Sequence, residues 1–458
     1  MSELSPSSTR KERAVPTATE AQPSTRPVWR QLARRREYRA LLRVRLAGQF
    51  ADGVFQASLA GAILFNPERA AHAADIASGF AVLLLPYSVI GPFAGVLLDR
   101  WSRQRVLFGA NLLRALLVCA VAGEIGAGLH GQPFYLSALV VVSVNRFVLS
   151  ALSAGQPHVV PYEQLISANA ISTTAGALAT AAGGGTAIGI RVLAGHGNTG
   201  YASIALGAAV CYTLAGLAAL RFTIHQLGPD EQTRARRQSM RRVLGGLIAG
   251  ARHIGGRPDV LRAFVVIGLH RFFYGVMVIC TLLLYRNYFT DSGVLRAGLT
   301  GIGQVVLATA LGGGLAALVS PAAARRWGYV RWSAGLLMLS ALVVLALGMP
   351  FRLATFLPAA ALLGLGAQGV KICVDTITAQ QIDDEFRGRV FSVYDMVFNL
   401  VFVAAAVLTA LVLPENGRST AALVVIAISY LVTGLGYLLA SESVRSAQPA
   451  DGAEIQAA

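Results

Sequence analysis

The chain has 458 residues, of which 55% are hydrophobic and 14% are charged, and its mean hydropathy is +0.58. Soluble proteins carry charged residues at about a quarter of their positions, so this composition excludes a soluble domain and places much of the chain in lipid. The formal net charge of +16 is compatible with a nucleic-acid partner. Whether the basic residues have that role depends on where they lie along the chain. The four cysteines are widely spaced in apolar segments, which predicts neither a disulfide nor a metal site.

Residues 1–38 are rich in Ser, Pro, Thr and Arg and lack an apolar period, which predicts a disordered tail. Long apolar segments follow, each with enough residues to cross about 30 Å of hydrocarbon. Glycine triplets at 183–185 and 312–314 weaken an isolated helix but suit close contacts between membrane helices. Twelve spans are predicted, at 41–65, 76–98, 106–128, 134–155, 166–190, 201–222, 260–285, 297–320, 333–350, 354–378, 390–413 and 420–440.

The basic residues are distributed unevenly between the two sides of these spans. Of the 39, 29 lie in the tails, in the loops that twelve spans place on the same side, or at the adjoining span ends, and four lie inside spans. This bias predicts that both termini are cytoplasmic. It makes the basic residues orientation signals and contacts for membrane lipids, and it predicts no nucleic-acid partner. Six basic residues lie on the opposite side: Arg69, Arg191, Arg286, Arg296, Arg352 and Arg418.

A basic segment at 223–259 divides the spans six and six. Within it, the apolar stripe of residues 243–254 predicts an amphipathic helix on the membrane surface. Arg100-Trp101 after the second span recurs as Arg326-Trp327 after the eighth, which favours two duplicated halves. We therefore predict an all-α integral membrane protein with twelve transmembrane helices. Its two six-helix bundles are predicted at 39–222 and 260–441, with a C-terminal tail at 442–458.

One acid and three arginines lie between the second and third spans, which is typical of a tight cytoplasmic loop. The stretch reads Gly95-Val-Leu-Leu-Asp99-Arg100-Trp-Ser-Arg103-Gln-Arg105. It resembles the signature loop of the major facilitator superfamily of transporters, G-x-x-x-D-R-x-G-R-R, with serine at the usual second glycine. The resemblance implies the twelve-helix fold of that family. It also implies that Asp99 faces the N-terminal end of helix 11 and gates the cytoplasmic side.

Three further stretches carry the resemblance. Asn145-Arg146-Phe147 resembles the family's R-F motif, whose arginine is tied to proton coupling. Val160-Pro161 opens a stretch similar to the entry of helix 5, and Arg387-Gly388-Arg389-Val390 resembles the entry of helix 11. The last two point to the branch of enterobactin-exporter-type and related drug exporters. The Gly-Pro kink of drug antiporters is missing, and Gly183-Gly184 stand about where it belongs.

Ionisable residues inside lipid cost about 3 kcal/mol each and mark functional candidates. Asp52 is interpreted as a proton or substrate site, since burial favours a carboxylate that loads and releases protons near neutral pH. The alternative is a packing acid bonded to Gln49 or to an arginine of another helix. The predicted spans contain six candidates: Asp52, Arg114, Arg146, Arg271, Lys371 and Asp375.

The positive candidates have alternative roles. Arg146 is expected as the partner of a carboxylate or of an anionic substrate, or else as part of a fixed ion pair. Lys371 and Asp375, spaced i, i+4, are expected to pair directly, either structurally or as a second charge switch. Arg271 is expected to hold an anion, with Tyr274 stacking on an aromatic group, or to be a snorkelling arginine. Arg114 is interpreted as structural.

The sequence predicts a secondary transporter of the bacterial inner membrane rather than an enzyme. We expect proton-coupled export of a small amphipathic molecule (a drug, siderophore or secondary metabolite) by alternating access. The proton gradient is the expected energy source, without a cofactor or metal, and the protein is expected to act as a monomer. The alternatives are an uptake carrier, a lysolipid flippase, or a membrane receptor or assembly partner without transport.

Overall fold

The computed structural model describes residues 28–64, 73–89, 93, 98, 101–129, 131–161, 164–195, 197–228, 240–291 and 294–447. The regular elements of these residues are helices. They are α1 (Val28–Arg34), α2 (Arg36–Leu64), α3 (Ala73–Val89), α5 (Arg103–Gly126), α6 (Gln132–Gly155), η1 (Gln156–His158), α7 (Leu165–Ala194), α8 (Asn198–Ala219), α10 (Met240–Gly255), α11 (Pro258–Asn287), α12 (Gly298–Trp327), α13 (Tyr329–Val343), η3 (Val344–Gly348), α14 (Leu353–Gln381), α15 (Asp384–Val412) and α16 (Thr420–Ala447).

Nine helical segments of the described chain are long and apolar enough to cross a membrane. They involve α5, α6, α8 and the helices from α11 to α16. The remaining predicted spans correspond to α2, α3 and α7, of which α2 begins with several charged residues and α3 is described over 17 residues. The chain is therefore an all-helical, multi-pass membrane protein.

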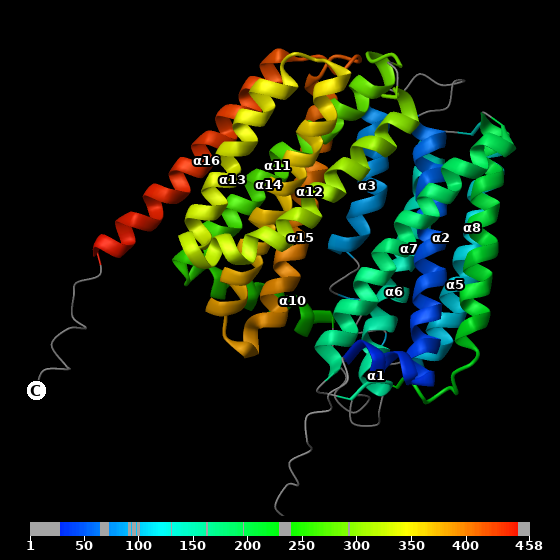
Figure 1. The fold of residues 1–458 in the computed structure, drawn as a ribbon. Coiled ribbons are helices and arrows are strands. Elements are labelled where there is room, and N and C mark those ends of the chain that lie inside the picture. Colours follow the sequence, from blue (N-terminus) through cyan, green and yellow to red (C-terminus); the bar gives the residue numbers. More distant parts are fainter. Residues whose placement is uncertain are drawn as a thin grey trace, which may run out of the picture.

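The helices pack in two groups, which Figure 1 shows side by side. In the N-terminal group, α2 packs against α7 and α8, and α5 against α6 and α8. In the C-terminal group, α12 packs against α14, α13 against α16, and α11 against α15. Helix α3 contacts both α6 and α15, so it lies where the groups meet. Each group has its own apolar core, because each is built from helices that bury one face against their neighbours.

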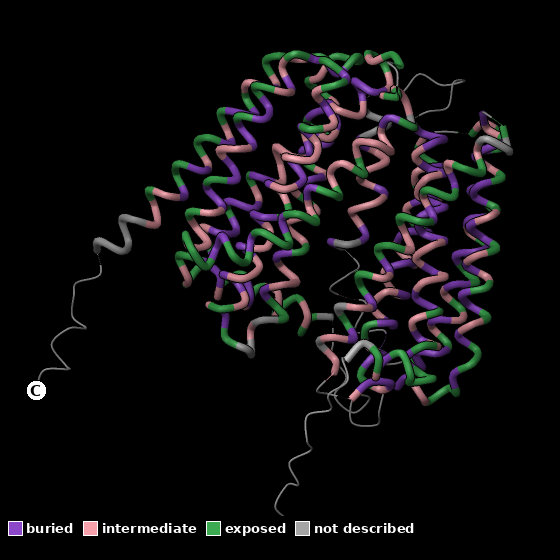
Figure 2. Tube along the Cα trace, in the orientation of Figure 1, coloured by how far each residue is buried: buried purple, intermediate pink, exposed green. Residues whose placement is uncertain are grey.

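The outward faces of the helices are apolar as well. On α8, the exposed positions Leu206, Val210, Leu214 and Leu217 follow one another at helical spacing. Figure 2 shows such exposed positions along the outer helices of both groups. A stripe of this kind suits contact with lipid chains rather than with water.

Glycines of the triplets in α7 and α12 lie at close helix contacts. A Cβ on Gly183 would lie 2.1 Å from the Phe50 carbonyl oxygen of α2. A Cβ on Gly312 would lie 1.8 Å from the Ala361 carbonyl oxygen of α14. Both glycines therefore let two helix backbones meet, as expected for membrane helices.

Several predicted boundaries differ from the observed ones. The disordered tail was predicted to reach residue 38, but α1 and the start of α2 occupy most of 28–38, because Leu32 and Tyr38 are buried there. The Tyr38 hydroxyl also donates to the Ala168 carbonyl oxygen over 3.2 Å. At the other end, α16 continues six residues past 441, to Ala447. The helix predicted at 243–254 is confirmed as α10, and its place on the membrane surface stays a prediction.

Candidate functional site

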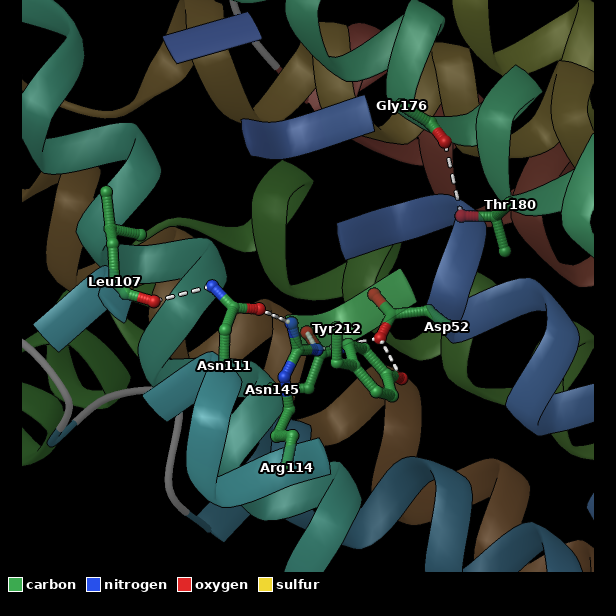
Figure 3. A network of polar contacts seen from close by, with 8 residues as sticks. All are labelled: Asp52, Leu107, Asn111, Arg114, Asn145, Gly176, Thr180 and Tyr212. Atoms are coloured by element: carbon green, nitrogen blue, oxygen red, sulfur yellow. Dashed lines mark hydrogen bonds and ion pairs between the residues drawn. The ribbon is translucent and has the colours of Figure 1, made fainter. Parts of the chain in front are cut away.

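A buried polar network lies inside the N-terminal group, where α2, α5, α6 and α8 meet (Figure 3). Asp52 of α2 accepts a hydrogen bond from Arg114 Nη1 of α5 over 2.8 Å. The same carboxylate oxygen accepts one from the Tyr212 hydroxyl of α8 over 2.7 Å. The guanidinium carbon of Arg114 also lies 4.1 Å from the centroid of the Tyr212 ring. Arg114 is 0% exposed and Asp52 6% exposed, so this ion pair is removed from water.

Two amides complete the surroundings of Arg114. Its Nη1 donates to Asn145 Oδ1 of α6 over 2.7 Å, and its Nη2 donates to Asn111 Oδ1. Asn111 Nδ2 donates in turn to the Leu107 carbonyl oxygen over 2.6 Å, which fixes the orientation of that amide. The guanidinium therefore keeps two neutral acceptors besides the carboxylate. A protonated Asp52 would not leave Arg114 without hydrogen-bond acceptors.

The arginine bonded to Asp52 is Arg114, not Arg146. The structure thus shows Asp52 in an ion pair with an arginine of another helix, which was the alternative interpretation of Asp52. Asn145 and Arg146 are adjacent on α6 but serve different groups: Asn145 contacts Arg114, whereas Arg146 interacts electrostatically with Asp395 of α15.

A second set of charges lies on α14 and α15. Lys371 Nζ donates to Asp375 Oδ2 over 2.6 Å, which is the direct pair that the i, i+4 spacing predicts. About a third of each side chain is exposed, so this pair is less buried than the Asp52–Arg114 pair. Lys371 Nζ also lies 5.3 Å from the ring centroid of Tyr394. Asp395 interacts electrostatically with Lys371 as well as with Arg146, so charges of both helix groups meet here.

Arg271 of α11 lines a cavity of about 530 Å³. Its guanidinium carbon lies 4.1 Å from the ring centroid of Phe398 and 4.4 Å from that of Phe402, both on α15. Tyr274, one turn along α11, also lines the cavity, at 5.9 Å from the guanidinium carbon. Phe80 of α3 contributes to the same wall and packs against Phe402, with 5.1 Å between ring centroids. The cavity is thus lined mainly by helices of the C-terminal group, with Phe80 of α3 contributed by the N-terminal group.

The signature loop is described only in part. Gly95, Asp99 and Arg100 lie outside the described residues, so the predicted contact of Asp99 with helix 11 stays a prediction. Arg103 donates through Nη1 to the carbonyl oxygens of Ala154 and Leu227, over 2.9 and 3.0 Å, and ties α6 to the segment after α8. Arg105 is exposed.

The sequence analysis missed several members of these clusters. Asn111, Asn145 and Tyr212 are uncharged, so the criterion of intramembrane charge does not detect them. Asp395 lies within a predicted span, at 390–413, and the same criterion would have selected it. Within the described residues, no group of three or more His, Cys, Asp or Glu side chains is arranged to hold a metal ion.

An all-helical membrane chain with buried charges and an apolar cavity between two groups of helices has the architecture of a membrane transport protein. Solved structures share this fold. A POT-family transporter in complex with 5-aminolevulinic acid superposes with a TM-score of 0.62 at 14% identity, over 89% of this chain and 96% of that one. The nucleoside transporter NupG gives a TM-score of 0.60 at 12% identity, over 90% and 98%.

Sequence comparison gives the family. No family model matches the chain. It is 38% identical to the uncharacterized MFS-type transporter Rv0037c of Mycobacterium tuberculosis over 397 residues, 86% of this chain and 88% of the relative. It is 35% identical to macrolide efflux protein A of Streptococcus pyogenes over 129 residues, 26% of this chain and 30% of the relative. The chain belongs to the major facilitator superfamily; it is a transporter and not an enzyme.

Proposed function

We propose that the protein exports a small amphipathic molecule in exchange for protons, by alternating access between two six-helix halves. In this proposal all twelve long helices cross the membrane, with α2, α3 and α7 completing the nine strongest candidates. The cavity beside Arg271 carries the proposal, because an apolar space of about 530 Å³ with few polar groups is the form that small-molecule sites take. The similarity to a macrolide efflux protein over part of the chain favours export.

The position of the cavity supports alternating access. Its walls come from α11, α12, α14 and α15 of the C-terminal group and from α3, through Phe80. A rocking motion that separates α3 from α15 would part Phe80 from Phe402 and open this space to one side of the membrane. The polar end at Arg271 and the apolar remainder suit an amphipathic cargo.

The Asp52 network supplies a proton-dependent element. Ionised Asp52 attracts Arg114 and joins α2 to α5, and the Tyr212 hydroxyl joins the same carboxylate to α8. Protonation removes the charge attraction, while Asn111 and Asn145 still accept hydrogen bonds from Arg114. A proton therefore changes how three helices are held together without leaving a buried cation unsatisfied. Coupling of transport to protons requires that protonation change the relative stability of the two conformational states of the carrier.

The charges between the groups form the second part of the mechanism. Arg146, Lys371, Asp375 and Asp395 bring both signs together from α6, α14 and α15. Because these contacts join the two groups, motion of the halves changes them. We assign them to holding one state of the carrier, and we assign the signature loop around Asp99 to closing its cytoplasmic side. The protein is proposed to act as a monomer in the bacterial inner membrane, with both termini in the cytoplasm.

Proton flux in everted membrane vesicles tests this function. An imposed pH gradient is challenged with a panel of siderophores, antibiotics, lysolipids and simple amphipaths, in wild-type protein and in Asp52→Asn. We expect one class of compound to collapse the gradient in wild type and to fail in Asp52→Asn, because asparagine still accepts a hydrogen bond from Tyr212 but cannot exchange a proton.

Glu124→Gln is the matched control, since Glu124 is a carboxylate of α5 that bonds Ser137 away from the Asp52 network. It should transport like wild type. If inserted wild-type protein responds to no compound, proton-coupled export of these classes is rejected. If compounds move without proton flux, or only inward, an uptake carrier or flippase replaces the antiporter.

A further inference from the structure

Arg271 differs from the other intramembrane cations whose contacts are described above. Arg114 is paired with Asp52 at 2.8 Å, and Lys371 with Asp375 at 2.6 Å. Among the described residues, no acid lies within ion-pair distance of the Arg271 guanidinium, and no side chain or backbone oxygen accepts a hydrogen bond from it. Its electrostatic neighbours are the hydroxyls of three tyrosines, Tyr274, Tyr394 and Tyr430.

The aromatic rings beside Arg271 compensate only part of the free-energy cost of an unpaired cation within the membrane. Contact of a guanidinium with an aromatic ring contributes about 0.5–2 kcal/mol, and Phe398 and Phe402 both supply one. An arginine within a membrane costs about 3 kcal/mol or more. The rings supply no oxygen or nitrogen acceptor for the N–H donors of the guanidinium, and its buried Nε has no acceptor in the described chain. The site therefore has unused donors with a full positive charge.

A guanidinium carries its N–H donors at its edge, in one plane. That arrangement matches the two oxygens of a carboxylate or a phosphate, which accept two parallel hydrogen bonds. A lysine at this position would offer a point charge without the fork. The chemistry of the free edge thus selects an anion with two oxygens.

The rest of the cavity determines what the anion is attached to. The side chains that line it beyond Arg271 are mainly aliphatic and aromatic, and they come from α11, α12 and α14: Met277, Val278, Ile302, Val305, Phe356 and Leu363. Thr281 and Thr309 are the hydroxyl-bearing aliphatic residues of the wall, and Thr309 already donates to the Val305 carbonyl oxygen. An apolar chain or ring system fits this lining, while a second charge does not.

We infer that the transported molecule is an anionic amphipath, whose carboxylate or phosphate group binds Arg271 and whose apolar body fills the cavity. The inference rests on the proposed function in taking this cavity as the transport site. It restricts the chemical class of the cargo, because Arg271 would repel a cationic amphipath and no carboxylate of the described residues lies near enough to balance that repulsion.

Equilibrium binding to the purified chain in zwitterionic lipid nanodiscs tests the inference. The probes share a twelve-carbon chain and differ in the headgroup: dodecanoate, dodecyl phosphate, dodecanol and dodecylammonium. We expect wild-type protein to prefer both anions over dodecanol by at least tenfold and to bind dodecylammonium least. Comparison of the two anions distinguishes a carboxylate-selective site from a phosphate-selective one. Preference for either anion supports an anionic amphipath as the cargo.

Three variants assign the preference to Arg271. Arg271→Gln should bind the anions no better than dodecanol, with dodecanol affinity unchanged, and Arg271→Lys should keep only part of the preference. Arg352→Gln, in an exposed loop, is the matched control and should behave like wild type. Because Arg271→Gln removes an unpaired cation, its thermal stability should equal or exceed that of wild type. Dodecanoate should raise the melting temperature of wild type but not of this variant.

Two results overturn the inference. One is equal affinity of wild type for the anions and dodecanol. The other is a folded Arg271→Gln variant that keeps the anion preference, which places the anion elsewhere. Failure of the proposed function is distinguishable: anions then bind in an Arg271-dependent way, but no probe moves across vesicles containing the protein and none dissipates a pH gradient.

Discussion

At the scale of single residues, Arg114 and Arg271 show two different environments for a cation in a membrane protein. Arg114 has a carboxylate and two amide oxygens around it, whereas Arg271 is stacked on phenylalanine rings with its donors unused. The first arrangement stabilises the fold, and the second raises the energy of the unliganded protein. Substitution should therefore have opposite effects on stability at the two positions.

Arg114→Ala should destabilise the protein by about 3–5 kcal/mol, because it removes the cation that compensates the buried Asp52 carboxylate. Unfolding in SDS–detergent mixtures, followed by circular dichroism, measures this change. The double variant Arg114→Ala with Asp52→Ala should recover part of the loss, since it removes both charges. Equal stability of the single variant and wild type would show that the network does not hold the N-terminal group together.

The sequence identified charged members of these sites but not their pairing. The rule that an intramembrane charge is costly selects Asp52, Arg114, Arg271 and Lys371 directly from their positions in apolar runs. Pairing between helices depends on how each helix is rotated, and one sequence does not specify that rotation. For this reason the sequence left the partners of Asp52 and Arg146 open, while the i, i+4 pair of Lys371 with Asp375 was predicted correctly from a single helix.

At the scale of helices, the apolar runs of the sequence predicted the positions of the helices well and the residues at which they begin and end poorly. Each predicted span overlaps a described helix, since the period of the apolar residues is a local property. Several helices extend beyond the predicted spans. Helix α2 begins at Arg36 rather than at 41, and α15 begins at Asp384 rather than at 390. Charged residues can continue a helix beyond the hydrocarbon, where hydropathy no longer marks it. The glycine triplets, which appeared to weaken two spans, form helix contacts.

Gly312→Ala should weaken the contact between α12 and α14. The added Cβ would lie 1.8 Å from the Ala361 carbonyl oxygen, a backbone atom that cannot turn away. Overpacking of this kind costs about 1–3 kcal/mol, and thermal unfolding in detergent measures it. Gly314→Ala, two residues along the same helix, is the control, because its Cβ meets nothing within 4 Å. If both variants melt alike, α12 and α14 do not depend on this close approach.

At the scale of the whole molecule, the two helix groups meet where α3 lies against α15. Phe80 packs on Phe402, and the Ser88 hydroxyl donates to the Met396 carbonyl oxygen over 3.2 Å. Helix α3 contacts α15 more extensively than it contacts α6 or α2 of its own group. A rocking motion of the two halves would therefore have to separate this contact.

A covalent link across this contact should stop transport. Cysteines at positions 88 and 396, in a background whose native cysteines are replaced, are joined by a short bifunctional thiol reagent. If α3 and α15 must separate in each cycle, the linked protein should lose at least nine-tenths of its transport rate while still binding substrate at the cavity. Cleavage of the linker by a reducing agent should restore the rate. Each single-cysteine variant, treated in the same way, controls for modification alone. Full transport by the linked protein would show that α3 and α15 stay together throughout the cycle, and the motion would then have to occur between other helices.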